Sequence, residues 1–317
     1  MKLFSVDLDG TLLKSDKTIS IEEIDAINSL RKHKVIFSIS TGRPTKGIKK
    51  YLDLFNFKMP LTLFNGSLVE LYPSREILYE CKLKEGDARY IIKYLTDRNL
   101  EFIYYSNGDL YYLNFTERVK LYAKYSNLDP IKVDSVDEID YSNVIKVIWF
   151  LNKDEEENYN LDEFLCLEST TRIRSDFKYY EFINKDASKG KALKIIQDYY
   201  NIKDENTIAI GDEENDISMI KRAGIGVAMK NARESVKYIA DYVTENDNDH
   251  GGVLEVINKY ILKGDIKKWA NLNLMKMLST ILLHHQAWVL ESHHLIGQKY
   301  LLQIYLECNQ LALKQMY

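Results

Sequence analysis

Short runs of apolar, largely β-branched residues that do not alternate with polar ones constrain the fold of this 317-residue chain most strongly. They lie at residues 3–6, 35–39, 61–64, 207–210 and 225–228. Strands of this kind are covered on both faces, as in a parallel sheet between helices. Residues 21–33 carry apolar residues at helical spacing behind Ser20 and Glu23, which form an S-x-x-E capping pattern. The order strand, helix, strand predicts an α/β fold with a doubly wound, Rossmann-like parallel sheet and right-handed crossovers.

A change in composition between residues 82 and 187 indicates a second domain inserted in the first. Tyrosines become frequent there, and strand-like pieces at 101–105, 110–113, 144–150 and 179–183 alternate with polar residues. This pattern predicts an α+β insertion, and the parallel-sheet pattern resumes at about residue 188. We therefore expect a core domain of residues 1–81 and 188–264, and a cap domain of residues 82–187 that can serve as a lid.

Residues 265–317 differ from both domains. They hold three acidic residues, no proline and no arginine, but two of the three tryptophans and four of the six histidines. Apolar residues at helical spacing predict one or two amphipathic helices. We expect this C-terminal helical extension to pack on the protein or to mediate homo-oligomerisation, and a fusion or a change of reading frame is an alternative origin. The histidines are interpreted as solvated, because paired histidines on a helix seldom form a metal site.

Charge and cysteine content exclude several classes of protein. The net charge is -4 with a pI near 6.0, and no dense basic run is present, so we expect no nucleic-acid partner. Three widely separated cysteines without C-x-x-C spacing predict neither a disulfide framework nor a cysteine zinc site. We expect a cytoplasmic protein with no signal peptide and no membrane partner, since no run of about 18 apolar residues occurs.

Two carboxylates, Asp7 and Asp9, follow the first apolar run and precede a glycine and a threonine. Such residues also form ordinary turns, which is the plain alternative. A calcium loop is disfavoured, because Leu12 and Thr18 stand where it needs glycine and glutamate. Converging carboxylates repel unless a cation lies between them, and oxygen ligands beside a substrate anion suit Mg²⁺.

A second polar cluster, residues 40–44, follows the next apolar run and precedes a helix expected to begin at Thr45. Its hydroxyls, Gly42 and backbone N–H groups suit phosphate oxygens at a helix N-terminus. A nucleotide P-loop is rejected, because Ile48 stands where that motif requires lysine. Taken alone, the segment also fits an ordinary turn.

The third and fourth clusters add a cation and a further carboxylate. Lys189 falls in the first turn of a predicted helix, where the helix dipole disfavours a cation, so we expect an anion nearby; an exposed lysine is the alternative. Asp212 follows the strand ending at Gly211 and can join Asp7 and Asp9 around Mg²⁺. Glu213 and Glu214 are explained by helix capping alone.

With these clusters in order, the chain resembles the haloacid dehalogenase superfamily of phosphatases, and within it the Cof-type sugar-phosphatase subfamily. The resemblance rests on residues 7–11 (DLDGT), 40–44 (STGRP), 188–190 (SKG) and 211–216 (GDEEND). It extends over roughly residues 1–262. The expected enzyme class is therefore a phosphoric monoester hydrolase of the haloacid dehalogenase type.

The resemblance also implies roles for single residues. Asp7 would be the nucleophile that forms an aspartyl phosphate, and Asp9 the acid that protonates the leaving alcohol and then the base that activates water. The phosphate-binding residues it implies are Leu8, Thr41, Gly42, Lys189 and Asn215. The Mg²⁺ ligands it implies are Asp7, Asp9 through its carbonyl or its carboxylate, Asp212 and Asp216.

The function expected from the resemblance is Mg²⁺-dependent hydrolysis of small phosphorylated metabolites, such as sugar phosphates or phosphorylated cofactors. One alternative is phosphoryl transfer to a second hydroxyl, as in phosphomutases of the same superfamily. Another is a non-catalytic regulator that binds a metabolite on the same fold. The regulator is disfavoured, because all four of Asp7, Asp9, Lys189 and Asp212 are present.

Overall fold

A computed structural model describes residues 1–176 and 178–262 of the chain. Contacts divide the chain into the units Met1–Ile257 and Asn258–Tyr317. The expected C-terminal helices, the four histidines within them and the suggested homo-oligomer contact lie outside the described residues. Within the described residues, Cys81 and Cys166 are free.

The core contains a sheet of eight strands in the order β14-β13-β12-β1-β2-β3-β4-β5. The strands are β1 (Lys2–Asp7), β2 (Val35–Ser40), β3 (Met59–Leu63), β4 (Leu68–Tyr72), β5 (Glu76–Glu80), β12 (Thr207–Gly211), β13 (Ile225–Ala228) and β14 (Tyr242–Val243). Every neighbouring pair from β14 to β3 is parallel, which confirms the expected α/β class. All residues of β3 and β12 are buried, so both faces of the sheet are covered at these strands.

The sheet differs from a purely parallel one at its β5 edge, where β4 and β5 pair antiparallel. The cause is a tight reversal after β3 at Phe64, Asn65 and Gly66, whose φ angles are 50°, 58° and 99°. A side chain at Gly66 would place a Cβ 2.2 Å from the carbonyl oxygen of Ser188. The Asn-Gly pair therefore turns the chain back as an antiparallel strand instead of leading it into a crossover helix.

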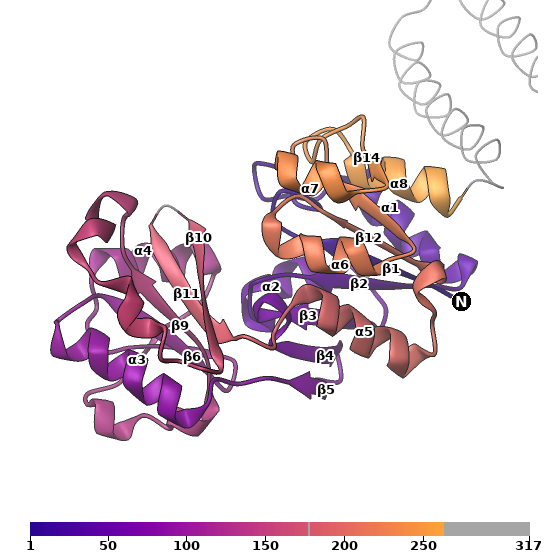
Figure 1. Ribbon diagram of the computed structural model, residues 1–317. Helices are drawn as coiled ribbons and strands as arrows, with labels where there is room; N and C mark the ends of the chain where they lie inside the picture. The colour runs from indigo at the N-terminus through magenta and orange to yellow at the C-terminus, as the bar shows by residue number, and fades with distance from the viewer. Residues whose placement is uncertain (177, 263–317) are drawn as a thin grey trace, which may run out of the picture. The chain divides into compact units, whose positions relative to one another are not determined.

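Helices pack around this sheet (Figure 1). They are α1 (Ile21–Ser29), α2 (Thr45–Leu52), α5 (Lys189–Tyr200), α6 (Ile217–Arg222), α7 (Glu234–Ile239) and α8 (Gly252–Tyr260). The expected cap of α1 is present, because the Ser20 hydroxyl accepts a hydrogen bond from the Glu23 backbone at 3.3 Å. The helix expected at Thr45 begins at that residue.

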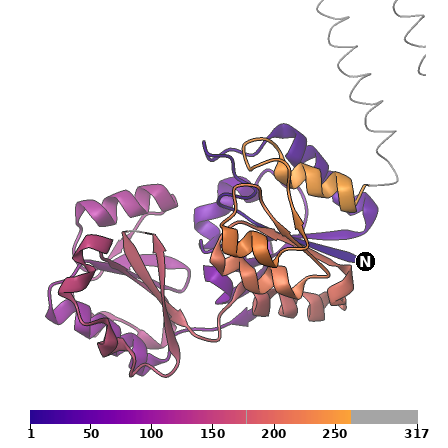
Figure 2. The same cartoon turned by 45° about the horizontal axis from the view of Figure 1, so that its top comes forward.

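The segment expected to form the cap contains a second sheet, in the order β10-β11-β9-β6-β7-β8, and the two sheets are separate in Figures 1 and 2. Its elements are α3 (Glu85–Asp97), β6 (Phe102–Ser106), β7 (Asp109–Tyr112), α4 (Glu117–Ser126), β8 (Ile131–Lys132), β9 (Val144–Phe150), β10 (Thr170–Asp176) and β11 (Tyr179–Asn184). Trp149 centres its apolar core, with Tyr94, Tyr159 and Phe164 against the indole ring. The tyrosine-rich segment thus folds as α+β structure with its own apolar core.

Short 3₁₀ turns connect these elements. They are η1 (Leu30–His33), η2 (Phe64–Gly66), η3 (Val136–Glu138), η4 (Tyr141–Asn143), η5 (Lys153–Asn158), η6 (Leu161–Phe164), η7 (Asp204–Asn206) and η8 (Glu214–Asp216). In the part of the chain that the structure describes, no helix has both the length and the apolar character that crossing a membrane requires.

Parallel pairing decides where the polar clusters meet. Asp7 at the end of β1 pairs with Ser40 at the end of β2, and Val6 pairs with Ile210 of β12. The loops that follow these three strands therefore leave the sheet at the same edge. Ligands of open α/β sheets bind outside the carboxyl ends of the strands, so this edge is the candidate site.

Candidate active site

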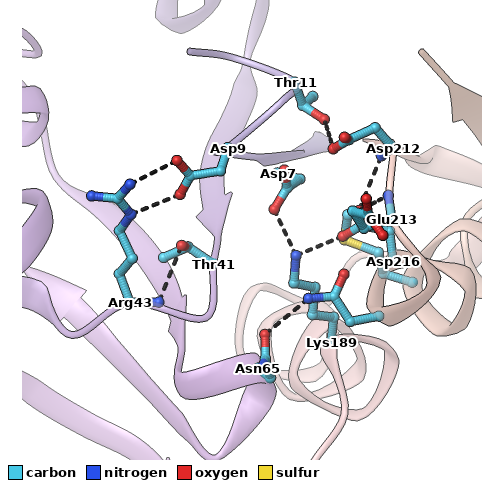
Figure 3. A network of polar contacts seen from close by, with 12 residues as sticks. Asp7, Asp9, Thr11, Thr41, Arg43, Asn65, Lys189, Asp212, Glu213 and Asp216 are labelled. Carbon is cyan, nitrogen blue, oxygen red and sulfur yellow. Dashed lines mark hydrogen bonds and ion pairs between the residues drawn. The ribbon is translucent and has the colours of Figure 1, made fainter. Parts of the chain in front are cut away.

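Lys189 occupies the centre of the site. Its ammonium group donates hydrogen bonds to Oδ1 of Asp7 and to Oδ1 of Asp216, both at 2.6 Å, and only 1% of the lysine side chain is exposed (Figure 3). Ser188 caps helix α5 by accepting a hydrogen bond from the backbone of Lys191, so Lys189 lies in the first turn as expected. The anions that this unfavourable position required are the two carboxylates.

Three buried carboxylates meet beside Lys189. They are Asp7, Asp212 and Asp216, and each contributes one carboxylate oxygen to a group of three oxygens that lie within 4.8 Å of one another. The Thr11 hydroxyl donates a hydrogen bond to Asp212 Oδ1 at 2.9 Å. The Lys189 ammonium group is hydrogen-bonded to two of the three carboxylates, Asp7 and Asp216. Carboxylate oxygens are the ligands that Mg²⁺ prefers, and this donor set fits the expected metal.

The backbone at the start of the fourth motif fixes Asp216. Its Oδ2 accepts hydrogen bonds from the backbone N–H groups of Asp212 and Glu213, both at 3.0 Å, while its Oδ1 binds Lys189. Asp216 is fully buried. Sequence reasoning explained part of this acidic run by helix capping. In the structure Asp216 both closes the turn after β12 and places a carboxylate against Lys189.

Burial and mutual repulsion disturb the ionisation of this cluster. Burial raises the pKa of Asp7 well above its ordinary value, and the charges of Asp216 and Asp212 add to the rise, although Lys189 opposes it. Burial and the charge of Asp216 raise the pKa of Asp212 to about 7. Burial alone would lower the pKa of Lys189, but Asp216 and Asp7 outweigh it and raise that pKa. A further cation would relieve the same repulsion.

Asp9 points away from the carboxylate cluster and toward Arg43 (Figure 3). The guanidinium group donates from Nε and Nη2 to the two oxygens of Asp9, each at 2.7 Å, and Lys17 Nζ lies 2.9 Å from Oδ1. Burial by itself would raise the pKa of Asp9, but the hydrogen bonds and charge of Arg43 outweigh it and lower that pKa. In this geometry Arg43 and Lys17 hold the Asp9 carboxylate, which is not part of the three-carboxylate cluster.

The phosphate-binding residues expected from the sequence occupy the loops around this cluster. Thr41 is buried, and its backbone N–H donates to the Thr62 carbonyl at 2.8 Å. Gly42 lies so close to Asn65 that an added Cβ would stand 2.8 Å from Oδ1 of Asn65. The Leu8 side chain is fully buried in the core, so a role for Leu8 in phosphate binding falls to its backbone.

Sequence reasoning gave no site role to three polar residues, Arg43, Asn65 and Lys17. Asn65 accepts a hydrogen bond at 3.0 Å from the side-chain amide of Asn215, which the fourth motif did predict. Lys17 binds Asp9 from the loop after β1. An Asn-Gly pair directly after a strand is a turn signal that could have drawn attention to Asn65. Lys17 carries no comparable signal, because a lysine in a polar loop is usually solvated.

Comparisons with known proteins bear on the family and the fold. The family model of the haloacid dehalogenase-like hydrolases matches residues 4–257. A 5-amino-6-(5-phospho-D-ribitylamino)uracil phosphatase, YitU from Bacillus subtilis strain 168, is 29% identical over 81% of this chain and 97% of its own. A haloacid dehalogenase-like hydrolase from Bacteroides thetaiotaomicron has a similar structure, with a TM-score of 0.74 and 28% identity over 81% of this chain and 98% of its own.

A further solved structure, described as the subclass IIB sugar phosphatase BT4131 of the same superfamily, has a TM-score of 0.70 and 25% identity. It aligns over 82% of this chain and 99% of its own. These matches confirm the resemblance that the four motifs indicated, and with it the expected enzyme class.

Mg²⁺ should stabilise the folded protein through the three-carboxylate cluster. We expect the melting temperature Tm to rise when Mg²⁺ is added after treatment with a chelator, because an ion that binds only the folded state adds about 2.7 kcal/mol at 100 times its Kd. Asp212→Asn removes one of the buried charges and should abolish most of that rise. Differential scanning fluorimetry measures both.

The control is Asp25→Asn, which removes an exposed carboxylate on α1 and should leave the Mg²⁺ effect unchanged. Equal Mg²⁺ shifts in wild type and Asp212→Asn would contradict the assignment of the cluster as the metal site.

Proposed function

Because the chain belongs to the haloacid dehalogenase-like hydrolases, we propose that it is a Mg²⁺-dependent phosphomonoester hydrolase of small phosphorylated metabolites. We propose further that the reaction passes through an aspartyl phosphate at Asp7. The observation that carries the proposal is the buried Lys189 ammonium between Asp7 and Asp216, next to Asp212. The names of the relatives, a phosphorylated ribitylaminouracil phosphatase and a sugar phosphatase, support the substrate class.

The positive charge of Lys189 explains why such a site suits phosphate esters. A carboxylate that attacks a phosphate dianion meets repulsion, and the Lys189 ammonium offsets part of it while holding Asp7 in place. Asp7, Asp212 and Asp216 are the residues that would hold Mg²⁺, with the backbone carbonyl of Asp9 as a further ligand. Bound Mg²⁺ would stabilise the negative charge on the phosphoryl oxygens.

In the first half-reaction an oxygen of Asp7 forms a bond to phosphorus as the ester P–O bond breaks. The leaving alkoxide takes a proton from Asp9 and departs as an alcohol. In the second half-reaction the ionised Asp9 accepts a proton from water. The water oxygen then bonds to phosphorus, the Asp7–phosphorus bond breaks, and inorganic phosphate leaves with Asp7 restored.

The contacts of Asp9 fit the second of these roles directly. Arg43 and Lys17 hold its carboxylate ionised, which is the form that accepts a proton from water. For the first role Asp9 must carry a proton, and so it must give up part of this ion pairing when the ester binds. The ring of Tyr125 lies 5.1 Å from the Arg43 guanidinium carbon, so a cap residue covers the cation that controls Asp9.

Asp7→Asn should abolish phosphate release and leave the protein folded. We expect kcat to fall by a factor of about 10³ or more, because an amide cannot form the acyl phosphate. Release of inorganic phosphate from a panel of phosphorylated metabolites measures the loss, and circular dichroism checks the fold. The exposed-carboxylate variant Asp25→Asn should keep wild-type turnover. A folded Asp7→Asn protein with near-normal turnover would overturn the assignment of the nucleophile.

Asp9→Asn should show whether Asp9 acts as the proton donor, because its effect on kcat/KM should depend on the leaving group. For alkyl phosphates we expect kcat/KM to fall by about 10² to 10⁴, because the leaving alkoxide then receives no proton. The decrease should be much smaller for p-nitrophenyl phosphate, whose leaving group departs without protonation. The comparison is made on kcat/KM, which reports the first chemical step. Equal losses for both esters would argue against general acid catalysis by Asp9.

A further inference from the structure

The cap contains a buried ion pair that the proposed reaction does not use. Lys146 on β9 lies 3.1 Å from Oε1 of Glu181 on the neighbouring strand β11, and their side chains are only 2% and 7% exposed. Replacing a buried ion pair by apolar residues of similar volume is often neutral or stabilising. A contribution to folding stability is therefore a weak explanation for the presence of this ion pair.

The same two side chains reach the loops of the candidate active site. Lys146 Nζ donates to the carbonyl oxygen of Gly42 at 3.1 Å, within the phosphate-binding loop. Glu181 accepts at its other oxygen, Oε2, from the side-chain amide of Asn65 at 3.0 Å. Asn65 in turn accepts from the amide of Asn215. Lys146, Glu181, Asn65 and Asn215 thus form one hydrogen-bonded chain, called the relay below.

The charge of Glu181 gives the relay a fixed direction. A carboxylate paired with a lysine can only accept hydrogen bonds, so Asn65 must present its NH₂ group to Glu181. The carbonyl oxygen of Asn65 then faces Asn215, which must present its own NH₂ group in reply. The ion pair in the cap therefore selects the amide orientation of a residue in the fourth motif.

Backbone contacts tie the relay to the phosphate-binding loop as well. The N–H of Asn65 donates to the Thr41 carbonyl at 3.1 Å, and the N–H of Phe64 to the Arg43 carbonyl at 3.4 Å. Phe64 and Asn65 both have positive φ angles, 50° and 58°, which non-glycine residues rarely adopt. Such strain persists only where the surroundings hold it in place, and it often marks residues that position a site.

We propose that Lys146 and Glu181 are positioning residues that set, through Gly42 and Asn65, the placement of the 41–43 loop and the orientation of Asn215. This inference rests on the proposed function, because these groups face the phosphoryl group only if the site is a phosphatase site. Lys146 and Glu181 act through other residues and do not touch the substrate. Because their side chains are almost completely buried, we assign them this positioning role and not a role in binding the leaving group.

The test is the double variant Lys146→Met with Glu181→Met. It removes both charges together, so no unpaired buried charge remains and the protein should fold. We expect kcat/KM to fall by about 10- to 100-fold, because small misplacements of positioning groups have effects of this size. The inhibition constant of inorganic phosphate, a probe without a leaving group, should rise as well. If the double variant does not fold, Lys146→Met with Glu181→Gln, which also leaves no buried charge and keeps the shape of the acidic side chain but not its fixed polarity, should weaken phosphate binding in the same direction.

The matched control is the ion pair of Lys46 on α2 with Asp109 on β7, which also joins core to cap but lies at the surface. Lys46→Met with Asp109→Leu should change kcat/KM by no more than about twofold, since exposed pairs contribute little. Equal losses in the two double variants would overturn the relay, because any cap contact would then suffice.

Substrate comparison separates positioning from leaving-group recognition. The relay predicts the same proportional loss for p-nitrophenyl phosphate and for sugar phosphates. A loss confined to sugar phosphates, with phosphate inhibition unchanged, would overturn it. Wild-type activity in the folded relay variant would also overturn the inference while leaving the proposed function intact. A wild-type protein that releases phosphate from no ester would overturn the proposed function itself.

Discussion

The ammonium group of Lys189 is the interaction on which the site depends. It is buried between Asp7 and Asp216, and no helix dipole favours it there. Removing it would leave carboxylates crowded in a buried space, where repulsion would force protonation or movement. A divalent cation bound by the three carboxylates would relieve their repulsion further. The same ammonium group is hydrogen-bonded to Asp7, the carboxylate that we propose attacks the phosphoryl group, so in this proposal Lys189 serves both the assembly of the site and its chemistry.

Charged side chains farther from Lys189 fix the ionisation or the hydrogen-bond orientation of their neighbours. Arg43 and Lys17 hold Asp9 ionised at one side of the site, and the relay from Lys146 and Glu181 orients amides at the other. In each case a charged side chain decides how a neutral or ionisable neighbour presents its hydrogen bonds. The inserted segment thus makes polar contacts with the loops of the site, and several of its tyrosines belong to its own core.

Much of the fold could be predicted from the sequence, because parallel strands buried on both faces leave an unambiguous apolar signal. The position of Lys189 against the helix dipole likewise predicted an anion that the structure supplies. The antiparallel β4 and β5 were missed, since their reversal depends on three positive φ angles in succession. Lys146 and Glu181 were missed for a different reason: residues 35 positions apart, on strands paired only in three dimensions, leave no local pattern.

The central claim is that the group held by Lys189 attacks phosphorus. Its most direct test is chemical trapping: the enzyme is quenched in acid during turnover, treated with borohydride, digested and analysed by mass spectrometry. Borohydride reduces an acyl phosphate to an alcohol, so we predict homoserine in place of Asp7 in protein that was turning over substrate, and aspartate at every other acidic position of the site. Unmodified Asp7, or reduction at Asp9 or Asp212 instead, would contradict the account.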